Sequence, residues 1–201
     1  AVPCPDNPPG TSPDSATVDH ELGVPAQLTS AHCAAVGHAG TPNAWSTVAL
    51  SGDVPGRLFR HGTAEAGGLV YVFGGHRSGD SGSNYYNNRL TQIDPATGVC
   101  TRLDAGAGVT GAPPSARYRM GFAALDGVLW VFGGYDGSSR LSDLHAYTIA
   151  ARAWRQLDAA AGVSGTPPSA RLHMGFSAGA GGLLVTYGCC SPQDAHFFDV
   201  A

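Results

Sequence analysis

The chain has 201 residues, of which 43% are hydrophobic and 13% charged, and its formal net charge is -4. All eleven basic residues are arginine and they form no basic run, which excludes the positive surface typical of a nucleic-acid-binding protein. No apolar run approaches the roughly 18 residues that a membrane-spanning helix needs, and the 29 glycines and 14 prolines favour many short strands over long helices.

Residues 1–44 carry no clear periodicity. Their stretch CPDNPPGTSPDS is rich in proline, serine and aspartate, a composition that predicts irregular structure. We expect either an irregular N-terminal extension or a degenerate copy of the repeat that follows. The start lacks a methionine and an apolar signal core, which indicates a processed mature end or an internal fragment. A disulfide between Cys4 and Cys33 would close this segment, but the spacing of the five cysteines leaves the pairing open.

A long internal repeat occupies the rest of the chain. LDAGAGVTGAPPSARYRMGF at 103–122 returns as LDAAAGVSGTPPSARLHMGF at 157–176, with fifteen of the twenty positions identical. A weaker first copy, VPGRLFRHGTA, aligns through Gly62 with Gly121 and Gly175. Such self-similarity at a fixed period is the signature of a repeat architecture.

Each copy contains an apolar run that ends in glycine. The runs are LVYVFGG at 69–75, VLWVFGG at 128–134 and LLVTYGC at 183–189. Each is short and rich in β-branched and aromatic residues, which predicts a buried strand closed by a turn that needs positive φ. With a preceding strand, a later strand near LSDLHAYTI (141–149) and a fourth near AWRQLD (153–158), each period of about 50 residues predicts four antiparallel strands, the pattern of a β-propeller blade.

The second copy combines Gly133-Gly134 after an apolar strand, Asp143-Leu-x-x-Tyr147, and Trp154 seven residues after the tyrosine. Together with Pro-Pro-x-x-Arg, this combination resembles the kelch repeat over roughly residues 45–201. The resemblance implies an all-β fold of kelch-type blades, each with four antiparallel strands. It implies an outer strand at 45–50 and copies near residues 57–103, 114–157 and 168–201. The residues that carry the repeat are Gly74, Gly75, Gly133, Gly134, Asp143, Tyr147, Trp154, Trp45 and Cys100.

The first and third copies depart from this pattern. In the first, Ile93 stands for the tyrosine, Arg89 for the aspartate and Cys100 for the tryptophan. In a kelch blade this tryptophan packs between blades, so we expect Cys100 to be a buried core thiol, with Tyr85 and Tyr86 compensating for the lost volume. In the third copy, we expect Cys189 to stand in place of the second glycine.

The expected strands amount to about three blades, whereas propellers usually need four to eight. Two explanations are open. The chain is part of a longer protein that holds further blades, or two copies associate to complete a ring.

The resemblance implies a protein-interaction scaffold that binds a partner protein or peptide through the loops on one face. An acidic partner would suit the arginines of that face. Arginine suits this role because its planar guanidinium pairs with carboxylates through two hydrogen bonds. In peptide-binding kelch proteins a residue two positions before the inner-strand glycine points into the mouth, which here gives Arg119 and its equivalents Arg60 and His173. For Arg117 and Arg171 we favour a structural role. The candidate partner-binding residues are Arg60, Arg77, Tyr85, Tyr86, Arg119, Arg140 and His173.

The alternative is part of a secreted galactose-oxidase-like or carbohydrate-associated propeller. A binding function is favoured over an enzymatic one, and no catalytic residue, cofactor or metal ligand set is predicted. His32, Cys33 and His38 with Cys4 match no standard zinc module. Extracellular and cytoplasmic locations both fit the sequence, the extracellular one slightly better.

Overall fold

The computed structural model describes residues 43–78, 84–104, 106, 108–157, 163–189 and 193–200. Residues 49–201 form one compact unit, and the fold below is that of this unit. The described residues form strands and turns, and none of them belongs to a helix that could cross a membrane. The predicted all-β class is confirmed. The expected extension at 1–44 and the cysteines Cys4 and Cys33 lie almost wholly outside the described residues.

The first sheet has five strands in the order β1-β7-β6-β3-β2. β1 pairs with β7 in parallel, and the other neighbours are antiparallel. The strands are β1 (Ser51–Gly52), β2 (Gly62–Ala66), β3 (Leu69–Phe73), β6 (Leu90–Ile93) and β7 (Val99–Arg102).

The second sheet is the complete copy of the repeat. Its four strands follow the order β11-β10-β9-β8, and every neighbouring pair is antiparallel. They are β8 (Gly121–Leu125), β9 (Val128–Tyr135), β10 (Arg140–Thr148) and β11 (Ala153–Gln156).

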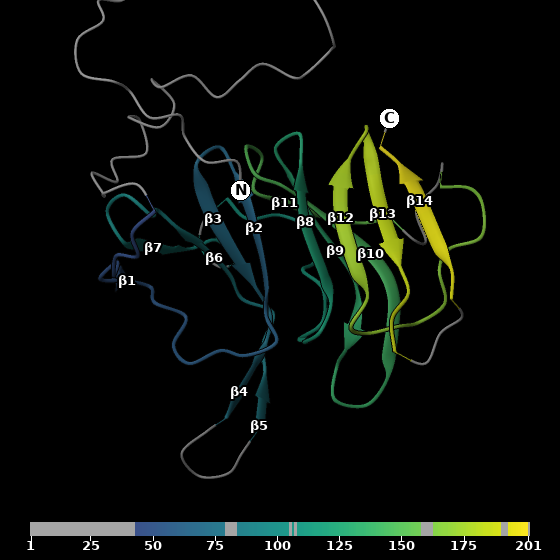
Figure 1. Cartoon of the computed structure of the whole chain (residues 1–201), viewed down its shortest axis with the longest axis horizontal. Helices are drawn as coiled ribbons and strands as arrows, with labels where there is room; N and C mark the ends of the chain where they lie inside the picture. Colours follow the sequence, from purple (N-terminus) through teal and green to yellow (C-terminus); the bar gives the residue numbers. More distant parts are fainter. Residues whose placement is uncertain are drawn as a thin grey trace, which may run out of the picture. The chain divides into compact units, whose positions relative to one another are not determined.

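The third sheet has three antiparallel strands, β12 (Gly175–Gly179), β13 (Gly182–Thr186) and β14 (Ala195–Asp199). A separate hairpin of β4 (His76–Ser78) and β5 (Asn84–Tyr86) projects from one end of the unit (Figure 1). β2, β8 and β12, each at one edge of its sheet, lie side by side (Figure 1).

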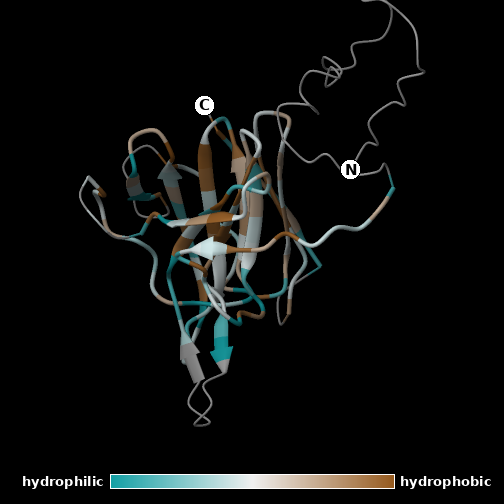
Figure 2. Cartoon of the chain, turned by 90° about the vertical axis from the view of Figure 1, so that its left-hand side faces the viewer, coloured by the Kyte–Doolittle hydropathy of each residue, from teal (hydrophilic) through white to brown (hydrophobic). Residues whose placement is uncertain are grey.

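The middle sheet is buried on both faces, which explains why its central strand is apolar without interruption. Successive side chains of a strand point to opposite faces. Leu129 and Val131 therefore join the core shared with the first sheet, whereas Trp130 and Phe132 join the core shared with the third. Figure 2 shows the hydrophobic residues concentrated along the strands.

The outer strand expected at residues 45–50 is not formed. None of these residues lies in a strand, and the Trp45 side chain is fully exposed. The strand that pairs with the outer edge of the first sheet is instead β1, which begins at Ser51.

Cys100 is buried, as expected, and forms no disulfide within the described residues. Burial raises the pKa of its thiol, which leaves it a poor nucleophile. The expected compensation by Tyr86 is wrong, because the Tyr86 ring packs on Tyr118. The segment that lies against Cys100 is β1, whose Gly52 pairs with Cys100 in register.

The turn after the central strand requires positive φ at two successive positions. In the first two copies both are glycines, with φ of 63 and 100° at Gly74-Gly75 and 59 and 99° at Gly133-Gly134. In the third copy the pair is Tyr187 and Gly188, with φ of 53 and 120°. The expectation that Cys189 replaces the second glycine is therefore wrong by one position. A non-glycine residue in this left-handed region costs roughly 1–2 kcal/mol.

Candidate functional site on the loop face

Two fully buried arginines brace the loops that precede β8 and β12. Arg117 donates hydrogen bonds to both carboxylate oxygens of Asp143, at 2.6 and 2.7 Å, and to the carbonyl of Gly133 at 3.1 Å. Arg171 makes the equivalent bonds to Asp194 at 2.5 and 2.9 Å and to a carbonyl of the following turn at 3.0 Å. These contacts support the structural role expected for both arginines, because a buried charge needs such a partner.

The acceptor carboxylates are held ionised by their partners. Burial would raise the pKa of Asp143, but hydrogen bonds from His145 and Arg117, together with the positive charge of Arg117, outweigh it and keep that pKa well below 3.8. Hydrogen bonds from Arg171, and a smaller contribution from His196, likewise keep the pKa of Asp194 well below its ordinary value. Both carboxylates therefore stay ionised near neutral pH and keep their pairing with the two arginines.

Arg60, Arg119 and His173 form what we call the rim row. All three adopt left-handed backbone conformations, with φ of 59, 59 and 58°. The N–H of Arg119 donates to the carbonyl of Arg60 at 2.9 Å, and the N–H of His173 donates to the carbonyl of Arg119 at 3.1 Å. The structure thus brings three residues together that lie more than fifty residues apart along the chain.

The rim row concentrates positive charge in one place. Arg60 and His173 are exposed and Arg119 is partly buried. Desolvation lowers the pKa of His173, and the positive charges of Arg119 and Arg60 lower it further. A negative ligand placed here would meet two permanent charges and a histidine that gains a third as the pH falls.

A cluster of rings, which we call the aromatic patch, adjoins the rim row. Tyr86 and Tyr118 stack with ring centroids 5.0 Å apart. His76 lies 5.4 Å from Tyr86 and 5.7 Å from Tyr118. Phe59 meets His76 edge-on at 4.5 Å, and Tyr135 meets Tyr118 edge-on at 5.7 Å.

Arginines of the rim row cover the aromatic patch. The guanidinium carbon of Arg119 lies 5.1 Å from the Tyr118 ring centroid, and that of Arg60 lies 5.8 Å from both the Phe59 and Tyr118 rings. Stacking of this kind orients the guanidinium plane while leaving its edge free for hydrogen bonds.

Two buried nitrogen atoms at this site have no hydrogen-bond partner among the described residues. They are Nδ1 of His76, whose side chain is 9% exposed, and Nε of Arg119. Buried polar groups are paired in the great majority of cases. Both nitrogen atoms therefore keep unused hydrogen-bonding capacity at this site.

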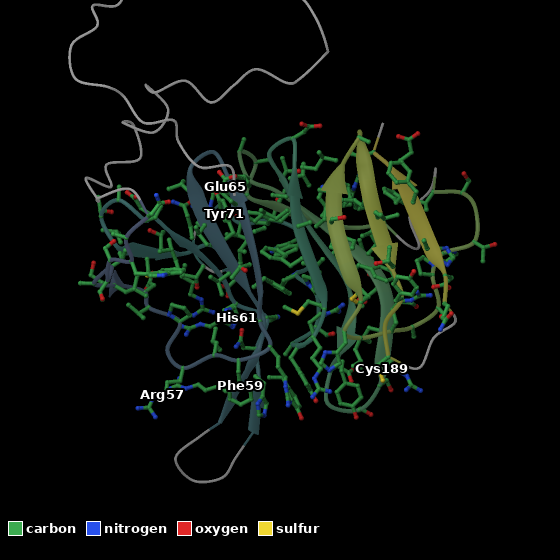
Figure 3. All side chains as sticks on the ribbon, in the orientation of Figure 1. Arg57, Phe59, His61, Glu65, Tyr71 and Cys189 are labelled. Atoms are coloured by element: carbon green, nitrogen blue, oxygen red, sulfur yellow. The ribbon has the colours of Figure 1, made fainter. Side chains whose placement is uncertain are left out.

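Of the remaining predicted site residues, Arg77 lies exposed on β4 and Arg140 lies exposed at the start of β10, opposite Tyr135 in the register. The side chain of Tyr85 lies outside the described residues. Figure 3 shows Phe59 and Cys189 at the same end of the unit, remote from Glu65.

Sequence reasoning missed most of the aromatic patch. Phe59 and Tyr118 immediately precede Arg60 and Arg119, so an aromatic residue followed by arginine was a usable signal. His76 and Tyr135 follow the two glycine pairs directly. In the third copy, Leu172 and Cys189 occupy the corresponding positions. They form an isolated β-bridge with each other, as the matching residues of the first two copies do. Because neither is aromatic, the aromatic patch belongs to the first two copies.

Within the described part of the chain, no three His, Cys, Asp or Glu side chains gather as they would to hold a metal ion. The residues His32, Cys33 and His38 lie outside that part.

Comparisons with known proteins bear on this architecture. The family model described as the KLHDC2/KLHL20/DRC7 Kelch-repeats domain matches residues 32–201. The chain is also 28% identical over 118 residues to the leucine-zipper-like transcriptional regulator 1 homolog of Drosophila melanogaster, an overlap of 57% of this chain and 12% of that protein. The chain therefore spans about one eighth of that relative's length.

Proposed function

The chain belongs to the kelch-repeat family, whose domains typically bind proteins, and we propose that it binds an acidic peptide segment of a partner protein through its loop face. The observation that carries this proposal is the rim row, in which Arg60 and Arg119 are joined by a backbone hydrogen bond and stacked on the aromatic patch.

The chemistry of the face suits such a ligand. Carboxylates of the peptide would accept charge-assisted hydrogen bonds from Arg119 and Arg60. Apolar or aromatic side chains of the peptide would contact Tyr86 and Tyr118, since tyrosine and arginine dominate the energetics of protein interfaces. The chain as a whole has a formal net charge of -4, so it does not attract acidic molecules in general. The local positive charge of the rim row would therefore select acidic ligands at this place.

The proposal is tested with Arg119→Ala. The probe is a library of fluorescent peptides in which acidic members are matched with neutral ones of the same length, measured by anisotropy. We expect acidic peptides to bind preferentially and Arg119→Ala to weaken that binding by about 2 kcal/mol or more, the size of an interface hot spot.

The matched control is Arg155→Ala, which removes an exposed arginine from β11, outside the rim row. Its peptide affinity should equal that of the unmodified protein. Equal affinities for acidic and neutral peptides, or an unchanged affinity in Arg119→Ala, would contradict the proposal.

A further inference from the structure

The rim row holds a basic side chain in every copy of the repeat, although its backbone position does not favour one. Arg60, Arg119 and His173 have φ of 59, 59 and 58°. Glycine adopts this left-handed conformation freely, whereas a residue with a Cβ atom costs roughly 1–2 kcal/mol there. Residues held in such conformations cluster at ligand-binding and active sites. The three basic groups are therefore kept in place at a cost in stability.

The two arginines of the rim row lack a counter-charge within the described part of the chain. No described carboxylate forms an ion pair with Arg60 or Arg119, and the buried Nε of Arg119 has no described hydrogen-bond partner. The described arginines that do form ion pairs, each with an aspartate, are Arg102, Arg117 and Arg171. The positive charge of the rim row is thus available to an external anion.

The acidic residue that follows the aromatic patch is already engaged in its own loop. Asp136 lies directly after Tyr135, and its Oδ1 accepts hydrogen bonds from the backbone N–H groups of Ser139 and Ser138, at 2.7 and 2.8 Å. These bonds lower the pKa of Asp136. Its carboxylate therefore stabilises the loop between β9 and β10 and does not pair with the rim row.

The three basic groups lie close enough together to act on a single anion. The guanidinium carbons of Arg119 and Arg60 lie 5.1 and 5.8 Å from the centroid of the same ring, that of Tyr118. Besides desolvation, the charges of both arginines lower the pKa of His173. Since like charges repel, an anion with more than one negative charge would relieve the repulsion among the three groups.

A single carboxylate does not use all of this capacity. It has one negative charge and two oxygens, which one guanidinium can satisfy through two parallel hydrogen bonds. A phosphate monoester carries a charge of about -1.5 to -2 at pH 7 and has three strong acceptor oxygens. It can therefore accept hydrogen bonds from two guanidinium groups and an imidazole together.

We propose that the anion recognised by the rim row is a phosphate monoester on a phosphorylated side chain of the partner peptide, a refinement that rests on the binding function proposed above. The guanidinium groups of Arg60 and Arg119 donate to the phosphate oxygens, and the His173 imidazole donates a further hydrogen bond. The peptide chain beside the phosphate contacts Tyr118 and Tyr86 of the aromatic patch. Phosphorylation of the partner then controls formation of the complex.

The test uses the fluorescent peptides described above, with one position varied. That position carries serine, glutamate, two successive glutamates, phosphoserine or phosphotyrosine. Anisotropy measures each affinity for the full chain at about pH 7.5, where the phosphate is mostly dianionic, and NMR locates the perturbed residues. We expect one or both phosphopeptides to bind at least tenfold more tightly than either glutamate peptide, with perturbations at Arg60, Arg119 and His173.

The outcomes separate the two proposals. If the double-glutamate peptide binds as tightly as the phosphopeptides, net charge alone is recognised, so the phosphate assignment fails and the acidic-peptide function stands. Phosphopeptide binding that perturbs residues outside the rim row would likewise overturn the assignment. If no anionic peptide binds more tightly than the serine peptide, both proposals fail.

Matched glutamine variants test the individual side chains. Arg60→Gln and His173→Gln each replace an exposed side chain of the rim row, and Arg155→Gln replaces an exposed arginine of β11 as the control. All three should keep the thermal midpoint within a few degrees. We expect each rim variant to lower the ratio of phosphopeptide to single-glutamate affinity at least threefold, and Arg155→Gln to leave it unchanged. An unchanged ratio in both rim variants, or an equal loss in Arg155→Gln, would overturn the proposal.

Discussion

Arg117 and Arg119 lie two positions apart in the chain, yet the first is buried against Asp143 and the second reaches the loop face. The bidentate bond of Arg117 fixes the loop before β8, and the left-handed φ of Arg119 then turns the chain toward its neighbours in the rim row. In the first copy, Leu58 stands at the position of Arg117 and Arg89 at that of Asp143. Both members of the ion pair are thus replaced in the first copy.

We predict that Asp143→Asn destabilises the protein by about 3–5 kcal/mol, because it leaves the Arg117 guanidinium buried without a counter-charge. The double variant Arg117→Leu/Asp143→Asn should regain more than half of that loss, since the first copy places a leucine at the same position. Urea denaturation measures both free energies of unfolding, and the exposed Asp199→Asn serves as control. Equal destabilisation by the single and double variants would contradict the coupling.

The lowered pKa of His173 predicts a pH dependence with a definite sign. Below pH 6.5 the unfolded chain protonates this histidine while the folded protein keeps it neutral, so its contribution lowers the free energy of unfolding as the pH falls. An acidic peptide bound to the rim row should raise that pKa, and its affinity should therefore increase as the pH drops through this window. Affinity titrations from pH 7.5 to about 5, with His173→Gln as control, measure the effect. A pH dependence that persists in His173→Gln would assign it to another group.

At the scale of single elements, each of the hairpins β2–β3, β8–β9 and β12–β13 turns through two residues of positive φ. These are Gly67-Gly68, Asp126-Gly127 and Ala180-Gly181, and tight hairpins of this type prefer Asn, Asp or Gly at both positions. Alanine at the first position of the third hairpin, with φ of 51°, is the exception. The third sheet combines this turn with Tyr187, another non-glycine residue of positive φ, at a position that holds glycine in the other two copies.

We predict that Ala180→Gly stabilises the protein by about 1 kcal/mol, because glycine adopts positive φ without the cost that a Cβ atom imposes. Ala195→Gly in β14 is the matched control, since the same exchange inside a strand destabilises by roughly 0.5–1 kcal/mol. Thermal or urea unfolding measures both changes. A loss of stability in Ala180→Gly would show that contacts of the alanine side chain outweigh the backbone strain.

At the scale of the unit formed by residues 49–201, the three sheets share two cores, and only the middle sheet is covered on both faces. On the third sheet, Leu184 and Phe197 stand opposite each other in register and are 38% and 55% exposed, whereas their neighbours Leu183 and Phe198 face the core. The sequence leaves two possibilities open, further blades in a longer chain or a ring completed by a second copy. The mass of the native particle distinguishes these two possibilities.

The sequence by itself determined the all-β class, the repeat and the equivalence of Arg60, Arg119 and His173, because glycine turns and strand periodicity are local properties. It also determined that Cys100 is a buried thiol, because the repeat assigns it the tryptophan position. Only the tertiary structure decided the aromatic patch. The rings that meet there come from separate copies and loops, and their approach depends on how neighbouring sheets pack. The register at Tyr187 likewise depends on the bridge between Leu172 and Cys189, a hydrogen-bonded pairing that no local pattern records.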